Sequence, residues 1–181
     1  MKTNRLKALP LFILLVLIFF SACEEQDPTV LPAETQTGKI TFGCYVGSDI
    51  FVNPYRNNSW LKANYFRDSN NQCFVSINTH NNVRKSINII FNNFELNKKN
   101  IIQSVEYIYY SDTIKLAGGG YTFKTNTYFG ENISAITLTK FDTLNHIISG
   151  KFEFELKNLE DTTKIIKFTQ GRFDAYLSIF K

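Results

Sequence analysis

The chain has 181 residues, with 20 lysines and arginines against 16 acidic residues and a formal net charge of +4. Three of these basic residues, Lys2, Arg5 and Lys7, lie in residues 1–22, which leaves 17 basic and 16 acidic residues in the rest of the chain. This near balance gives no strongly basic face, so we expect no nucleic-acid partner, and the length suits a single domain.

Residues 1–22 have the pattern of a secretory signal. A basic head precedes an apolar run from Ala8 to Phe20, and the small residues Ser21 and Ala22 follow it. The run is shorter than the ~20 residues that a membrane-spanning helix needs. The sequence therefore predicts a cleaved signal peptide rather than a structural element.

Ser21-Ala22-Cys23 resembles the lipobox of bacterial lipoproteins, in which the signal is cut before a cysteine that carries acyl chains. The resemblance implies a lipid anchor on Cys23 and an outer-membrane lipoprotein. Glu24 to Asp27 is similar to the acidic stretch that follows the lipidated cysteine in surface-exported lipoproteins of the Bacteroidetes. A plain solvated linker is the alternative, with the protein at the periplasmic face. Residues 23–38 are predicted to form a flexible tether before one domain at 39–181.

Apolar residues alternate with period two from Lys39 to the C-terminus, which predicts strands. Phe42, Cys44 and Val46, for example, share one phase of the first strand. The strands expected from this alternation are 41–46, 50–52, 60–66, 72–79, 84–91, 105–110, 113–116, 121–129, 133–140, 146–156 and 164–179. Segment 94–104 is ambiguous, because it fits either a turn or a short helix over 98–103.

About ten short strands with polar turns predict an all-β domain, either an antiparallel barrel or a β-sandwich. The chain has 17 phenylalanines and 9 tyrosines, which we expect to fill the core.

Residues 38–46, 150–154 and 169–174 are similar to those of an uncharacterised family of Bacteroidetes lipoproteins. The resemblance implies an all-β, lipocalin-like barrel in the cell envelope. It carries over no catalytic residue.

If Cys23 is acylated, Cys44 and Cys73 are the two cysteines left to pair with each other. Outside the cytoplasm they can form a disulfide. Two buried free thiols are the alternative, since both lie on apolar phases of expected strands.

Trp60, Tyr107, Tyr109 and Arg172 are candidate ligand-binding residues. The aromatic rings can form a wall for a sugar or an apolar ligand, or they can simply pack on the sheet. Arg172 is expected to pair in solvent with Asp174, two residues away on the same strand face, and a ligand carboxylate is its alternative partner. Gly171 beside it suits a β-bulge.

No catalytic or metal site is predicted. His80 and His146 are distant in sequence, with no cysteine or carboxylate at a metal-like spacing. Gly118-Gly119-Gly120 is followed by a strand-like pattern, so a hairpin loop is favoured over a phosphate site. We expect no cofactor.

Thr113, Thr143 and Thr162 each follow an aspartate in a triplet that resembles the site O-glycosylated in Bacteroidetes secreted proteins. All three fall in or beside expected turns, where an enzyme can reach the hydroxyl, but Asp-Thr also suits turns without modification.

These features favour a non-enzymatic envelope lipoprotein that binds a glycan, an apolar small molecule or an envelope protein. A structural or adhesive surface module is the alternative, and a hydrolase is the weakest of the three.

Overall fold

The computed structural model describes residues 27–54, 56, 58–67, 69, 72–81, 84–115 and 121–180, and these residues form an all-β structure. The nine strands are β1 (Thr41–Val46), β2 (Asp49–Val52), β3 (Leu61–Arg67), β4 (Cys73–Asn81), β5 (Lys85–Asn92), β6 (Lys99–Lys115), β7 (Tyr121–Asp142), β8 (Ile147–Asn158) and β9 (Ile165–Ile179). No helix occurs in the described residues, so the all-β prediction is confirmed. The alternative of a short helix over 98–103 is wrong, because β6 already begins at Lys99.

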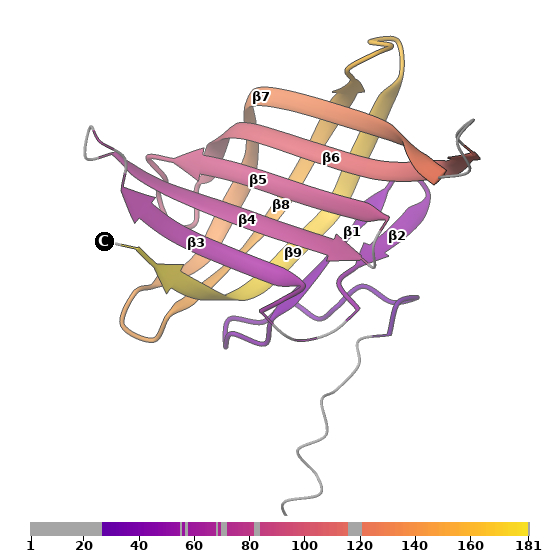
Figure 1. The fold of residues 1–181 in the computed structure, drawn as a ribbon. Helices are drawn as coiled ribbons and strands as arrows, with labels where there is room; N and C mark the ends of the chain where they lie inside the picture. Colours follow the sequence, from indigo (N-terminus) through magenta and orange to yellow (C-terminus); the bar gives the residue numbers. More distant parts are fainter. Residues whose placement is uncertain are drawn as a thin grey trace, which may run out of the picture.

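All nine strands belong to one sheet whose pairings close on themselves. The order is β2-β1-β9-β3-β4-β5-β6-β7-β8, and β8 pairs again with β9 to complete a ring. Figure 1 shows β3 to β6 crossing the front of this ring, with β8 and β9 running behind them at a steep angle. The sheet is mixed rather than fully antiparallel, since Ala63–Tyr65 of β3 pairs in parallel with Leu177–Ile179 of β9.

Strand β9 joins the parts of the ring. One edge of β9 pairs with β8, while its other edge pairs first with β1 and then, beyond Asp174, with β3. A register shift in both partners of β9 marks a bulge at Thr169 and Gln170, which together oppose Glu153 of β8. The sequence suggested a bulge at Gly171, and the structure has one directly before this residue.

Aromatic side chains fill the interior of the ring. The Phe152 ring packs on Phe42 and Phe154, with centroid distances of 5.2 and 5.3 Å. Phe168 continues this stack, 4.7 Å from Phe154 and 5.3 Å from Tyr107. All five rings are buried, which confirms that the aromatic residues supply the core.

Two strands are longer than the sequence suggested. The expected strands 105–110 and 113–116 are parts of β6, which has a register shift between Tyr110 and Thr113. The expected strands 121–129 and 133–140 likewise merge into β7, and the turn expected between them is a local irregularity with Asn132 at φ 52°. Pairing with β6 continues on both sides of this irregularity, so the chain bends there without reversing.

Cys44 and Cys73 are free thiols in this structure, and the disulfide between them is absent. Cys44 lies in the core opposite Phe51, whereas Cys73 begins β4 opposite Arg67. Burial raises the pKa of the Cys44 thiol. The Sγ atom of Cys73 accepts a hydrogen bond of 3.0 Å from the Tyr65 hydroxyl.

Candidate functional site

Residues 31–39, here called the N-terminal segment, lie against the outer face of the sheet. Pro32 is buried directly on Gly43 of β1, where a Cβ atom would come within 2.4 Å of Pro32 Cδ. In Figure 1 this segment, coloured indigo, runs along the lower side of the ring. A flexible tether was expected over 23–38, but residues 31–38, its second half, are packed on the domain.

Asp174 holds the N-terminal segment in place. It points outward from β9, between the inward Phe173 and Ala175, yet it is 1% exposed because the segment covers it. Thr37 and Gly38 of the segment and Ser149 of β8 converge on this carboxylate. The donors to the carboxylate are Thr35 Oγ1 (2.5 Å), Thr37 N (3.1 Å), Gly38 N (2.9 Å), Lys39 N (3.1 Å) and Ser149 Oγ (2.8 Å).

The prediction of a solvent-exposed ion pair between Arg172 and Asp174 is wrong. Asp174 is taken by the N-terminal segment, and Arg172 Nε instead donates to the backbone oxygen of Gln170 at 3.3 Å. The sequence placed both side chains correctly on one face of β9, but it did not show that residues 31–39 would cover one of them.

Several effects set the pKa of Asp174. Burial by itself raises it, but the hydrogen bonds from Thr35, Lys39, Ser149 and Gly38 together outweigh burial, so the pKa lies below the ordinary aspartate value. Those bonds favour the ionised form in the folded protein. Asp174 therefore adds stability that is present above its unfolded pKa of about 3.9 and is lost as the pH falls through its lower folded pKa.

We expect acidification below about pH 4 to release the N-terminal segment before the core unfolds. Pepsin cleavage within 31–39, followed by mass spectrometry between pH 5 and pH 2, measures this release. Asp174→Asn removes the titrating group and is expected to make cleavage there much less dependent on pH. Equal pH dependence in both proteins would show that Asp174 does not control the segment.

A groove runs between the N-terminal segment and the outer face of β7, β8 and β9. It consists of two hollows of about 450 and 200 Å³. Both hollows share Glu34, Lys151 and Arg172 in their walls, so we treat them as one outer-face groove. The larger hollow has a volume within the ~300–1,000 Å³ range of small-molecule sites.

Strand register gives the groove a row of cations. Lys99 pairs with Thr137, Thr137 with Lys151 and Lys151 with Arg172, which forms one line across β6, β7, β8 and β9. Adjacent strands lie about 4.8 Å apart, so Lys151 and Arg172 are neighbours and Lys99 is two strands further along. All four residues line the larger hollow.

The groove's charges are only partly neutralised within the protein. Lys151 Nζ forms an ion pair of 2.5 Å with Glu34, and both side chains are about half exposed. Glu153 Oε1 accepts the backbone N–H of Gln170 at 3.2 Å. Among the described residues, neither Nζ of Lys99 nor the terminal nitrogens of Arg172 have a hydrogen bond or an ion pair.

The β9 bulge shapes the floor of the groove. Gln170 has φ 50°, a left-handed conformation that costs a non-glycine residue about 1–3 kcal/mol and that occurs often at functional sites. Its backbone N–H and oxygen contact Glu153 and Arg172, respectively. The bulge thus fixes the two charged side chains that flank it.

The candidate aromatic residues are not brought together with Arg172. Tyr107 is 2% exposed and packs inside the ring, 5.9 Å from Tyr109 on the same face of β6. Trp60 precedes β3 and stacks on His80 with a centroid distance of 4.4 Å. Of the four candidates, Arg172 alone lines the groove.

Each of the two histidines packs against an aromatic side chain. Burial, with Lys62 nearby, lowers the pKa of His80. His146 stacks on Tyr176 at 5.4 Å and also borders an open hollow of about 720 Å³ with Tyr65. No group of three or more metal-ligating side chains is present in the described part of the chain.

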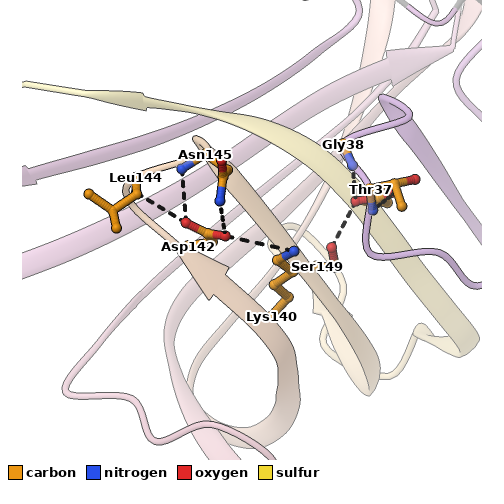
Figure 2. Close-up of polar contacts among 8 residues, drawn as sticks. Thr37, Gly38, Lys140, Asp142, Leu144, Asn145 and Ser149 are labelled. Carbon is orange, nitrogen blue, oxygen red and sulfur yellow. Dashed lines mark hydrogen bonds and ion pairs between the residues drawn. The ribbon is translucent and has the colours of Figure 1, made fainter.

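Two of the three candidate glycosylation sites, Thr143 and Thr162, lie in turns as expected, whereas Thr113 lies within β6 and the turn expected beside it is absent. Thr143 and Thr162 are both exposed. Asp142 accepts the backbone N–H groups of Leu144 and Asn145, and Lys140 approaches it at 3.7 Å (Figure 2). The aspartate before Thr143 thus has a structural role in its turn, and modification stays a prediction. The Thr113 side chain, Cys23 and Gly118-Gly119-Gly120 lie outside what the structure describes.

No family model matches this chain, and neither a curated protein nor a solved structure matches it significantly. In the described residues, no helix is long and apolar enough to cross a membrane.

Proposed function

We propose that this protein is a lipid-anchored lipoprotein of the cell envelope that binds an external ligand in the outer-face groove. The anchor rests on Cys23 and the signal pattern before it. The single observation that carries the binding function is the row Lys99–Thr137–Lys151–Arg172, which the strand register assembles inside a hollow of about 450 Å³.

The filled interior of the ring supports a site on the outside. Phe42, Phe152 and Phe168 occupy the centre, where a ligand-binding barrel would hold its ligand. The same filled core also favours the second candidate, a structural surface module without a small-molecule site. The two candidates differ in one property, since binding in the groove must depend on Arg172.

Cys23→Ala is expected to abolish acylation and release the protein from membranes. One acyl chain alone gives weak, reversible attachment, and stable anchoring needs more than one chain on this cysteine or an added signal. Detergent phase partitioning of the wild type and the variant measures the change. A variant that remains in the detergent phase would contradict the anchor.

Native mass spectrometry of the mature full chain tests the binding function. The protein is first exposed to an extract of the source cell's envelope and growth medium. A reproducible added mass that disappears in Arg172→Gln supports the groove. Lys167→Gln is the matched control, because Lys167 lies on the same strand and pairs with Glu155 at 2.7 Å. An unchanged bare protein favours the structural module.

A further inference from the structure

We propose that the ligand of the outer-face groove is a carbohydrate that carries carboxylate or sulfate groups. This inference rests on the proposed function and specifies the chemical class of its ligand. It follows from three features of the groove: the row of cations, the polar groups between them, and the position of Glu34.

The cations favour an anionic partner. Arg172 presents a guanidinium whose terminal nitrogens are unpaired among the described residues, and a planar fork of this kind binds carboxylate or sulfate in two parallel hydrogen bonds. Lys99 stands two strands beyond Lys151 in the same row. Anionic groups repeated along one ligand can therefore contact more than one cation at once.

The remaining lining favours a carbohydrate. Thr137, Gln170 and Glu153 supply hydroxyl, amide and carboxylate groups, which together can donate to and accept from sugar hydroxyls. Ala135 and Phe152 also line this hollow, but both side chains are buried, so the exposed groups that can orient a ligand there are polar.

A peptide cannot bind in this groove by adding a strand to the sheet. Peptides that extend a sheet need an unpaired strand edge. At Lys151, β8 pairs with β7 on one side and with β9 on the other, and β9 pairs with β1 at Arg172. The ligand must therefore bind through side chains on a face, which suits a sugar chain that lies across the strands.

Glu34 acts as an internal competitor for the ligand's anion. Its carboxylate reaches Lys151 from the N-terminal segment and occupies the place where a ligand carboxylate or sulfate would pair. Because both side chains are half exposed, the ion pair is weak and can exchange for a ligand anion. Removing the Glu34 charge should therefore strengthen binding.

The test measures binding of the mature full chain to matched oligosaccharides immobilised on an array. Uronic-acid oligosaccharides are compared with their methyl esters, and sulfated ones with their desulfated forms, so that each pair differs in charge alone. We expect retention of the charged members, a loss of about tenfold in Arg172→Gln and Lys151→Gln, and smaller losses in Arg172→Lys. Glu34→Gln should bind several-fold more tightly, and added salt should weaken binding.

The outcomes separate this inference from the proposed function. Retention of charged and uncharged members alike, still lost in Arg172→Gln but not in Lys167→Gln, overturns the anionic class and keeps the groove as a binding site. No retention by the wild type overturns the carbohydrate class and leaves the groove to be decided by the native mass spectrometry experiment. Retention that no groove variant alters overturns both proposals. The uronate and sulfate pairs show which of the two anions binds. Unfolding temperatures of the variants confirm that they are folded.

Discussion

Replacing Asp174 by alanine is expected to detach the N-terminal segment and to lower the free energy of unfolding by about 3 kcal/mol. The carboxylate accepts five hydrogen bonds, from Thr35, Thr37, Gly38, Lys39 and Ser149. Hydrogen bonds to a charged group contribute ~1.5–3 kcal/mol each, and donors left buried without a partner add a penalty. The total stays near 3 kcal/mol because the segment can leave the sheet and hydrate its own donors.

Urea unfolding and limited proteolysis measure this effect. The melting temperature should fall by roughly 6–12 °C, and cleavage within 31–39 should become fast at neutral pH. Asp161→Ala is the matched control, since Asp161 also accepts several hydrogen bonds but caps an exposed turn with Thr163. A loss in Asp174→Ala no larger than in this control would show that the segment is held by other contacts.

Gly171→Ala is expected to destabilise the protein by at least about 2 kcal/mol. A Cβ atom at this position would lie 2.3 to 2.6 Å from three carbons of the Phe152 ring. That ring cannot easily move, because it packs on Phe42 and Phe154 in the core. Overpacking of this kind typically costs ~1–3 kcal/mol, and a clash with a buried ring belongs at the upper end.

A compensating substitution separates this clash from a general loss of backbone freedom at the bulge. Phe152→Leu shortens the side chain and opens space above Gly171. The double variant is expected to be more stable than the sum of the two single losses by about 1 kcal/mol or more. Strictly additive losses in thermal unfolding would show that the glycine is required for its backbone alone.

Strand positions follow closely from the sequence because most strands bury one face. Ile87, Ile89 and Phe91 alternate along β5, and all three are fully buried. The alternation cannot show which strands are neighbours. The parallel contact between β3 and β9, which helps to close the ring, depends on residues more than 100 positions apart. Local pattern carries no information about such a pairing.

The candidate site was harder to predict for the same reason. Lys99, Lys151 and Arg172 come from three strands and look like ordinary surface charges in the sequence; only the register places them in one row. Arg172 was identified because it stands beside Gly171 in a motif-like run. The sequence does not indicate Glu34, since the stretch around it is rich in polar residues and proline and therefore predicts a tether. Nothing in the composition of this stretch shows that the Asp174 carboxylate binds it to the sheet.

Amide hydrogen exchange of Thr37, Gly38 and Lys39 tests the central claim most directly. These three N–H groups donate hydrogen bonds to Asp174 only while the N-terminal segment lies on the sheet and forms a wall of the groove. At neutral pH we predict exchange slowed well below the rate of an unstructured peptide, with the protection lost in Asp174→Asn. Exchange of these amides at the unstructured rate in the wild type would contradict the account, since the groove would then lack the wall that brings Glu34 to Lys151.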